Sequence, residues 1–324
     1  MCESSRVDVA VIGLGLIGGS LLRALAAGGH RMTGYDADPA TRELAGAAGF
    51  TVAGSVPEAV AGTDLVVLAV PLPVLPSVLD HLSGYDGLVT DVTSVKRPVL
   101  ELATKYGLRR YVGGHPMAGK EKSGFGAADP ALFAGCAWVL CLEPHLTELD
   151  GWLTLATLYT TLGARVVPVT AAEHDRAVAE VSHVPHLSAA ALALQLAEEP
   201  LASTLAAGSF RDGTRVAATR AELIVAMCGG NAAEVSNALH RLIGDLEEMR
   251  SALETDAERF LTPIVAAAGE LRRAWPPAAG APAEMAVDVQ ALLALGRAGG
   301  WVTAVAENRV EVMTMRPESG RNRR

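Results

Sequence analysis

Residues 7–18 read Val7-Asp8-Val9-Ala10-Val11-Ile12-Gly13-Leu14-Gly15-Leu16-Ile17-Gly18, and this stretch decides the fold class of the chain. Its first six residues have the apolar pattern of a strand, and residues 16–27 have the periodicity of a helix. The three glycines between strand and helix follow the G-x-G-x-x-G spacing that is typical of a dinucleotide-binding turn. The first glycine permits the tight turn, the second lets the backbone approach a pyrophosphate, and the third lets the helix pack against the strand.

A set of cofactor-binding residues follows from this turn. The free N–H groups and the positive dipole end of a helix N-terminus favour a bound phosphate. Asp36 ends the next predicted strand, where its carboxylate can accept both ribose hydroxyls and would repel a 2′-phosphate, which favours NAD over NADP. A glycine-rich turn without a ligand is the alternative, and a plain loop is the alternative for residues 70–73. The predicted cofactor-binding residues are Gly13, Leu14, Gly15, Leu16, Ile17, Gly18, Asp36, Val70 and Pro71.

The first half of the chain continues to alternate between apolar runs and helical stretches. Strands are expected at 32–35, 64–70, 88–91, 110–113, 137–142 and 164–168, and helices at 39–48, 95–106 and 147–162. This alternation predicts an α/β fold with a doubly wound, mainly parallel sheet of the Rossmann type. We place this domain at residues 1–170.

The pattern changes after about residue 170, where strand signals cease for a hundred residues. Helices are expected at 172–198, 217–228, 232–250 and 257–273, so residues 171–273 are predicted to form an all-helical domain. The first of these helices is rich in Ala and Leu, and we expect it to be buried in a dimer interface. Residues 274–324 are expected to hold a Pro-rich linker, a short helix and a strand-like run, and no role is assigned to them.

Composition narrows the class of protein. The chain has 324 residues, of which 50% are hydrophobic and 19% are charged, and its formal net charge is −9. The high hydrophobic content excludes a disordered chain, and the negative net charge argues against a nucleic-acid partner. No uninterrupted apolar run reaches the length of a membrane span, and the N-terminus lacks the pattern of a signal peptide, so we expect a cytoplasmic protein. Cys136 and Cys141 lie in an apolar strand pattern and are expected to be free, buried thiols.

Two polar segments follow predicted strands, at the sheet edge where doubly wound folds bind their ligands. In Asp91-Val92-Thr93-Ser94-Val95-Lys96, Ser94 is placed to cap the following helix. A cap with no further role is the alternative there. In Gly113-Gly114-His115-Pro116, the histidine is expected on a stiff, exposed loop, and its imidazole can take a proton near neutral pH. Ser94 and His115 are therefore candidate catalytic residues.

Five motifs in this order resemble the prephenate/arogenate dehydrogenase family, over about residues 6–255. They are residues 13–20, 91–96, 113–124, 181–186 and 210–215. The resemblance implies an NAD-dependent oxidation of a cyclohexadienol with loss of carbon dioxide, in tyrosine biosynthesis. The product would be 4-hydroxyphenylpyruvate from prephenate, or tyrosine from arogenate.

The resemblance also implies roles for single residues. His115 would take the proton of the substrate's 4-hydroxyl as hydride leaves the same carbon, and Ser94 would bind that hydroxyl and orient His115. Arg215 would bind the ring carboxylate, because a guanidinium is always charged and can bind in a fork. His186 would contact the substrate side chain. His183 is expected on the same helix face, with a packed polar pair as the alternative.

Lys120 and Glu121 follow His115 and complete the candidate substrate-binding residues. Some relatives carry a small hydroxylated residue at the position of Lys120, so the lysine either adds a cation to the site or faces water. Glu121 either gates the site or is solvated. A metal at His183 and His186 would need a third ligand that the sequence does not offer, so no metal is predicted.

A prephenate dehydrogenase that forms a homodimer is the leading hypothesis, with arogenate or an amino-substituted analogue as the alternative substrate. A β-hydroxyacid dehydrogenase would need a lysine base in the second domain, and the chain has no lysine after Leu146. A non-enzymatic NAD-sensing regulator would leave His115, Ser94 and Arg215 without a shared purpose. Because the net charge of −9 repels a dianionic substrate, local cations should matter more than their number suggests.

Overall fold

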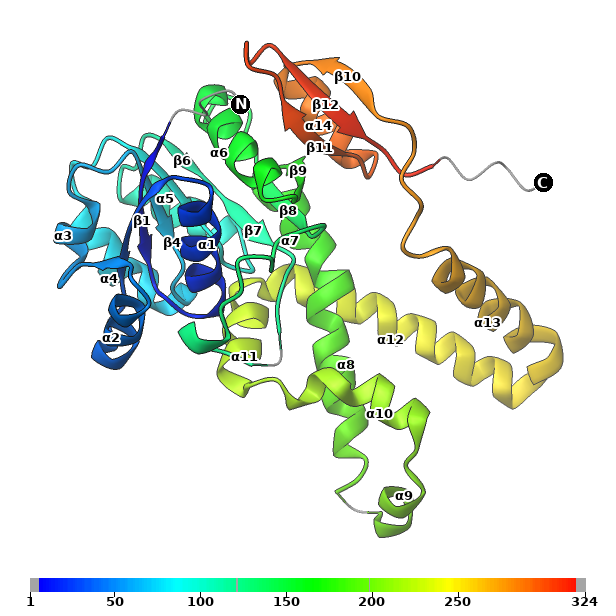
Figure 1. The fold of residues 1–324 in the computed structure, drawn as a ribbon. Coiled ribbons are helices and arrows are strands. Elements are labelled where there is room, and N and C mark those ends of the chain that lie inside the picture. Colours follow the sequence, from blue (N-terminus) through cyan, green and yellow to red (C-terminus); the bar gives the residue numbers. More distant parts are fainter. Residues whose placement is uncertain (1–5, 121, 198, 319–324) are drawn as a thin grey trace. The chain divides into compact units, whose positions relative to one another are not determined.

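The computed structural model describes residues 6–120, 122–197 and 199–318, and these form two compact units (Figure 1). The α/β unit contains the chain up to His174 together with Ala281–Arg316. The helical unit contains Asp175–Gly280. The C-terminal segment therefore does not form a separate tail, because most of it belongs to the α/β unit.

The first sheet of the α/β unit is parallel throughout and has the strand order β3-β2-β1-β4-β5-β6. This is the order of a dinucleotide-binding fold, in which ligands bind where the strand order reverses, here between β1 and β4. The strands are β1 (Asp8–Ile12), β2 (Arg31–Tyr35), β3 (Thr51–Val52), β4 (Leu65–Leu68), β5 (Leu88–Asp91) and β6 (Tyr111–Val112). The fold class predicted from the sequence is confirmed.

Short helices connect these strands. They are α1 (Leu16–Ala27), α2 (Pro39–Ala47), α3 (Val56–Val60), α4 (Leu75–Leu79) and α5 (Arg97–Lys105). The sequence predicted α1 with both of its ends, because a glycine precedes it and two glycines follow it. It did not predict β3, α3 or α4, which are too short to show a periodic pattern.

The second sheet of the α/β unit is mixed and has the order β10-β12-β11-β9-β8-β7. Of the strands described in it, only β8 and β9 pair in parallel. The strands are β7 (Gly114–Pro116), β8 (Ala137–Cys141), β9 (Arg165–Val169), β10 (Ala283–Ala286), β11 (Trp301–Val305) and β12 (Glu311–Met315). Residues 137–142 and 164–168 therefore do not extend the parallel sheet, as the sequence led us to expect, but belong to this second sheet.

One hydrophobic core serves both sheets. Helix α6 (Leu149–Thr161) carries Trp152 and Tyr159 into it, and the Tyr159 ring stacks on Trp138 of β8 at a centroid distance of 3.8 Å. Helix α14 (Val289–Arg297) packs against β9 so closely that a side chain at Gly296 would collide with the Pro168 carbonyl. The C-terminal segment therefore shares the core of the N-terminal domain.

Among its described residues, the helical unit has six whole helices and the end of a seventh. They are α7 (Ala171–Val178), which crosses the unit boundary, α8 (Val184–Leu194), α9 (Pro200–Leu205), α10 (Gly208–Thr214), α11 (Ala221–Gly230), α12 (Ala232–Thr255) and α13 (Ala257–Ala274). A π-helical turn, Ala179–His183, joins α7 to α8. The single helix expected over 172–198 is therefore wrong in two respects, because it contains this turn and ends at Leu194.

The burial expected for this helical run does not occur within one chain. Val181, Leu192 and Leu194 are half or more exposed. In the described part of the chain, the run Ala171–Leu194 is also the one helix long and apolar enough to cross a membrane by length and composition. The count of uninterrupted apolar residues did not predict this. A soluble protein's apolar helix passes the same test, so length and composition alone do not make it a membrane span.

Candidate active site

The glycine turn after β1 leaves an open space beside the start of α1. Gly13 has a φ of +98°, and a side chain there would collide with the Ala69 carbonyl. A side chain at Gly18 would collide with the carbonyl of Gly13, whereas a Cβ at Gly15 would meet no atom within 4 Å. The first and third glycines are thus required by the fold, and the second borders open space. No side chain caps α1, so its first N–H groups can bind a pyrophosphate.

Asp36 ties the end of β2 to this turn. Its Oδ2 accepts a hydrogen bond from the Leu14 N–H at 2.7 Å, and its Oδ1 accepts one from the Asp38 N–H at 2.9 Å. A carboxylate offers about four acceptor positions, so Asp36 can still accept from ribose hydroxyls. The Leu14 side chain is fully buried and its N–H donates to Asp36, so this residue supports the turn and presents no side chain to a ligand. The remaining predicted cofactor residues at the same sheet edge are half-buried Leu16, Ile17 and Val70 and exposed Pro71.

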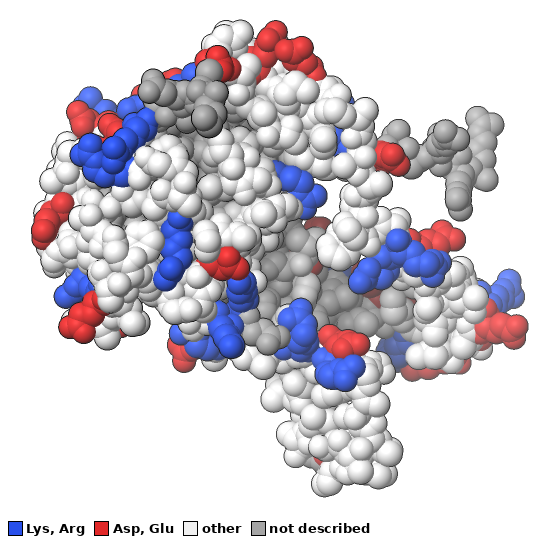
Figure 2. Space-filling view, in the orientation of Figure 1, with Lys and Arg blue, Asp and Glu red and all other residues white. Residues whose placement is uncertain are grey.

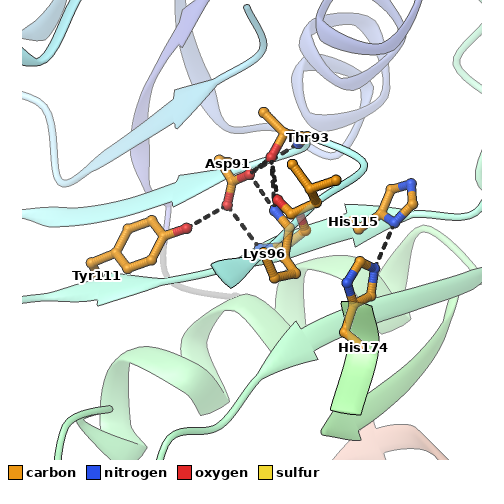
Figure 3. A network of polar contacts seen from close by, with 8 residues as sticks. Asp91, Thr93, Lys96, Tyr111, His115 and His174 are labelled. Carbon is orange, nitrogen blue, oxygen red and sulfur yellow. Dashed lines mark hydrogen bonds and ion pairs between the residues drawn. The ribbon is translucent and has the colours of Figure 1, made fainter. Parts of the chain in front are cut away.

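A buried ion pair lies at the end of β5. Asp91 and Lys96 are fully buried and pair with each other (Figure 3). The Lys96 ammonium also donates to the Gly114 carbonyl at 2.6 Å and to the Thr93 hydroxyl at 3.1 Å. The Tyr111 hydroxyl donates to Asp91 Oδ1 at 2.7 Å. Both charges are therefore paired and hydrogen-bonded, which a buried ion pair requires.

This ion pair joins the two sheets. Asp91 ends β5 of the first sheet, and its Oδ1 accepts from the Gly114 N–H, at the start of β7 in the second sheet, at 3.1 Å. A Cβ at Gly114 would lie 2.6 Å from the Asp91 carbonyl oxygen, so only glycine allows this approach. The sequence did not assign Lys96 a role. The available signal was a lysine five residues after a strand-ending acid.

His115 is the next residue on β7. It pairs with Val139 of β8 in antiparallel register and is half-buried, so the exposed loop expected from the sequence is wrong. Its Nδ1 lies 2.9 Å from Nε2 of His174, with the rings edge to face at 75° (Figure 3). His174 is 2% exposed. Sequence reasoning missed His174, because it lies 59 residues away and nothing local marks it as a partner of His115.

Helix α7 holds His174 in its first turn. Thr170 and Glu173 form a capping box, in which the Glu173 carboxylate accepts from the Thr170 N–H at 2.9 Å and the Thr170 hydroxyl accepts from the Glu173 N–H at 3.3 Å. Glu143 accepts from the Ala171 N–H at 2.5 Å. Arg297 of α14 pairs with Glu173 at 2.6 Å. The C-terminal segment thus contacts the residue beside His174.

The pKa values of Glu143 and Glu173 are shifted in opposite directions. Burial raises the pKa of Glu143, and the hydrogen bond from Ala171 offsets only part of this. Burial also acts to raise the pKa of Glu173, but the hydrogen bonds from Thr170 and the Arg297 guanidinium together outweigh it and lower that pKa. Glu173 therefore keeps its charge, and with it the ion pair, at neutral pH.

Ser94 lies in the loop after β5 and is half-buried. It does not cap the next helix, because α5 begins three residues later and no side chain caps it. The sequence placed the helix start near Val95, and the Lys96 ion pair occupies the residues in between. Among the described residues, no hydrogen-bond partner of the Ser94 hydroxyl is found. Its contact with a substrate hydroxyl stays a prediction.

In the helical unit, the two predicted histidines contact different elements. His183 is fully buried, with Nδ1 3.3 Å from the Asn231 amide, which also donates to the Asp175 carbonyl at 2.7 Å. His186 Nδ1 lies 3.3 Å from the Val216 carbonyl, in the 3-10 turn that Arg215 begins. The expected shared face is therefore not formed. The structure brings His186 close to the turn that carries Arg215, whose side chain is exposed.

Lys120 pairs with Asp129 at 2.7 Å, and both side chains are partly exposed. The hydrogen bond from Lys120 lowers the pKa of the Asp129 carboxyl. The ammonium thus has a partner within the chain, which supports the solvent-facing alternative. Glu121 lies outside the described residues. Among those described, no group of three or more His, Cys, Asp or Glu side chains could hold a metal ion.

Two family models match the chain one after the other. The nucleotide-binding domain of prephenate dehydrogenase matches residues 21–168, and the dimerization domain of prephenate dehydrogenase matches residues 170–265. The chain belongs to the prephenate dehydrogenase family. It is similar to prephenate dehydrogenase of Bacillus subtilis, with 32% identity over 267 residues, 78% of this chain and 72% of that protein.

Other members of the prephenate dehydrogenase family are similar as well. Prephenate dehydrogenase of Lactococcus lactis is 36% identical over 225 residues, and the match spans 64% of this chain but only 60% of that protein. The crystal structure of prephenate dehydrogenase from A. aeolicus, in complex with hydroxyphenyl propionate and NAD+, matches with a TM-score of 0.78 and 26% identity. That match covers 84% of this chain and 99% of the other.

The two domains of the prephenate dehydrogenase family do not account for the whole chain. Residues from 266 onward lie beyond both models, yet Ala281–Arg316 completes the sheet that carries His115. Sequence reasoning left this segment without a role. Its contacts with β9 and Glu173 join residues distant in sequence, and no local sequence pattern predicts them.

Proposed function

We propose that the protein is an NAD-dependent prephenate dehydrogenase, which converts prephenate to 4-hydroxyphenylpyruvate and carbon dioxide. One observation carries the proposal. His115, a half-buried imidazole whose ring contacts His174 and whose neighbour Gly114 is held by the Asp91–Lys96 pair, lies in the same unit as a glycine turn with open space for a dinucleotide. A family relative with 26% identity binds NAD+ and a phenol that carries a carboxylate side chain.

The cofactor supplies a nicotinamide that accepts hydride. The parts of this chain that would hold it are the N–H groups at the start of α1 and the carboxylate of Asp36. The open space at Gly15 fits a pyrophosphate, and the acid at the end of β2 fits an unphosphorylated ribose. These features favour NAD over NADP.

His115 would act as the general base. Loss of hydride builds positive charge on the carbinol carbon, and removal of the hydroxyl proton by His115 relieves it. The carbon becomes a carbonyl, and the ring carboxylate leaves as carbon dioxide. The electron pair of the broken bond moves through the ring to the carbonyl oxygen, which makes the ring aromatic, and protonated His115 would return its proton to that oxygen to give the phenol. Ser94, next to the buried ion pair, would donate to or accept from the same hydroxyl. A positioned base of this kind contributes about 10²–10⁴-fold to rate.

Arg215 would bind a substrate carboxylate and His186 the substrate side chain. Prephenate is a dianion, whereas the chain has a net charge of −9, so a local cation has to offset the repulsion. Arg215 is exposed and begins the turn that His186 contacts. His183, which is buried against Asn231, would instead support this part of the helical unit.

Substitution of Arg215 tests the carboxylate site. Arg215→Gln is expected to raise the KM for prephenate by about tenfold or more, since a charge-assisted hydrogen bond contributes roughly 1.5–3 kcal/mol. The turnover number should change little. Arg211→Gln, at another exposed arginine on the same segment, is the matched control. An unchanged KM in Arg215→Gln would assign the carboxylate to another residue.

The helical unit would join two copies of the chain into a homodimer. Its family domain is a dimerization domain. Figure 2 shows that the surface of α9 and of the end of α8 is largely without charged side chains. Exposed large apolar residues occur on most helices of the unit, namely Val181, Leu192, Leu194, Leu201, Leu205, Leu223, Val225, Ile243, Leu246, Leu253, Phe260, Val265 and Leu271.

Such a surface marks an interaction site. Because a dimer would cover this surface, it needs no membrane to bury it. The net charge of −9 argues against a nucleic-acid partner. We infer an enzyme that acts in the cytoplasm. Sedimentation equilibrium is expected to give twice the chain mass of 33.5 kDa. A monomer at micromolar concentration would contradict this.

A spectrophotometric assay tests the activity. The purified protein is incubated with prephenate or arogenate, each with NAD or NADP, and reduced cofactor is followed by its absorbance. We expect reduction of NAD with prephenate. Reduction only with arogenate would make the protein an arogenate dehydrogenase with the same site, since the two substrates differ in a pyruvyl or alanyl side chain. No reduced cofactor with either substrate would refute the proposed function.

A further inference from the structure

We propose that His174 is a positioning residue that fixes the proton of His115 on Nδ1 and so leaves Nε2 to act as the base. The proposal rests on the proposed function, because it assumes that His115 takes the substrate proton. It assigns a purpose to a buried imidazole that lies outside the five sequence motifs. It also gives the C-terminal segment a part in the site.

A hydrogen bond between two imidazoles has only two arrangements. One ring must donate and the other accept, because a neutral imidazole has one N–H and one bare nitrogen. His115 Nδ1 and His174 Nε2 are 2.9 Å apart and are therefore the two atoms that share the proton. Either His115 donates from Nδ1, or His174 donates from Nε2.

Only the first arrangement suits a base. If His115 donates from Nδ1, its Nε2 is unprotonated and can take the substrate proton. The bond to His174 then survives the proton transfer, because the imidazolium still carries the Nδ1 proton. If His174 donated instead, the neutral His115 would carry its proton on Nε2 and could not accept another there. The partner of a catalytic histidine sets its tautomer in this way.

The surroundings of His174 keep its ring in place. It is 2% exposed and lies in the first turn of α7, which the Thr170–Glu173 capping box and Glu143 fix at its start. Its backbone N–H donates to the Thr170 carbonyl at 2.9 Å. A side chain held by packing and a capped helix is suited to orient another, as the outer partner of a catalytic group does.

The C-terminal segment reinforces this helix start. Arg297 ends α14 and pairs with Glu173, the residue before His174, at 2.6 Å. The lowered pKa of Glu173 keeps its carboxylate charged at neutral pH. Residues beyond the two family domains thus support the helix turn that positions the base.

Nitrogen NMR of histidine side chains tests the proposal without any activity. In the protein labelled with 15N-histidine and without ligands, the His115 signal is assigned by its loss in His115→Asn. Above the titration range of the ring, we expect the Nδ1–H tautomer in the wild type. In His174→Phe, which keeps a ring but has no acceptor, we expect a shift toward the Nε2–H tautomer. An Nε2–H tautomer in the wild type would overturn the proposal.

Kinetics provide the second measurement. His174→Phe is expected to lower kcat by roughly 10- to 100-fold, a part of the about 10²–10⁴-fold that a general base contributes. The KM for NAD should not change. His174→Gln should recover much of the loss, because its amide oxygen can accept from Nδ1 of His115. His240→Phe, at an exposed histidine of α12, is the control.

These outcomes separate the two proposals. If the wild type reduces no cofactor, the proposed function fails, whereas the tautomer measurement still reports on the histidine pair. If the wild type is active, equal kcat values for His174→Phe, His174→Gln and the wild type overturn the positioning role. A loss of kcat in His174→Phe that His174→Gln does not restore, with the tautomer of His115 unchanged, also overturns it. Melting temperatures identify variants that have lost their fold.

Discussion

The two six-stranded sheets of the α/β unit are built in opposite ways. The first takes its strands from one continuous stretch, Asp8 to Val112, and all of them are parallel. The second takes its strands from Gly114 to Met315, interrupted by the whole helical unit. The glycine turn belongs to the first sheet and His115 to the second. Local sequence thus builds the proposed cofactor site, whereas contacts between residues 59 and 124 positions apart build the proposed catalytic site.

Substitution of Lys96 should disrupt the buried ion pair that connects the two sheets, and we expect the largest free-energy change of the series there. Lys96→Met would leave the buried Asp91 carboxylate without its cation, and we expect a loss of about 3–5 kcal/mol in the free energy of unfolding. Urea denaturation measures it. Lys105→Met, at an exposed lysine of the adjacent helix, is the control. If Asp91→Asn combined with Lys96→Met were no more stable than Lys96→Met alone, the unpaired charge would not be the cause.

Substitution of His115 should separate the functions of the two sheets. His115→Asn is expected to lower kcat by about 10²-fold, the scale of general-base catalysis, without a change in NAD affinity. Stopped-flow kinetics and cofactor fluorescence measure the two quantities. His145→Asn serves as the control, because His145 is exposed and its φ of +69° suits asparagine. Turnover equal to the wild type would remove His115 from its role.

Substitution of Gly15 in the glycine turn should weaken NAD binding, the quantity that His115→Asn leaves unchanged. Gly15→Ala places a methyl group in open space, so we expect unchanged stability but NAD binding weakened by about tenfold, or 1.4 kcal/mol. Gly18→Ala collides with the backbone and should lower the melting temperature instead. Thermal denaturation and NAD titration of both variants measure this. Unchanged NAD binding in Gly15→Ala would mean that the dinucleotide does not approach there.

An effect of similar size, on cofactor preference alone, is expected at Asp36. Asp36→Ala removes the charge that repels a 2′-phosphate, and Arg42, which donates to the Asp36 carbonyl at 2.6 Å, stays beside it. We expect the preference for NAD over NADP, measured as kcat/KM, to fall by roughly tenfold, which corresponds to about 1.4 kcal/mol. The Asp38→Ala control should lose only the cap of α2. Retained preference in Asp36→Ala would place the discrimination elsewhere.

The difference between the sheets also decides what could be predicted from the sequence. The strand before Gly13, helix α1 and the acid at Asp36 follow one another within about 30 residues, so propensity and spacing suffice. His115 was identified as a candidate, but its strand was taken for a loop, because a three-residue edge strand has no pattern of its own. His174 and Arg297 act through contacts with residues distant in sequence, which one sequence does not reveal.

The helical unit shows a second limit of prediction from sequence. Residues 172–198 are apolar at helical spacing, which predicts one continuous helix, and the π-helical turn Ala179–His183 interrupts it. Such turns occur frequently at functional sites and leave no trace in hydropathy. The turn ends at His183, which contacts Asn231, whereas His186 contacts the Arg215 turn. Spacing of three residues was therefore a poor guide to a shared face.

The late position of β11 and β12 has a consequence for biosynthesis. A ribosome that adds about 5–20 residues per second needs roughly 10–40 s for the some 200 residues between the end of the first sheet and the end of the second. From its own completion at Val169 until β11 is made at Trp301–Val305, β9 has no partner on the side where β11 will pair, and an unpaired strand edge is prone to bind other chains. The nascent protein can therefore complete its nucleotide-binding sheet long before its catalytic sheet, and we expect chaperones to protect that edge in the meantime.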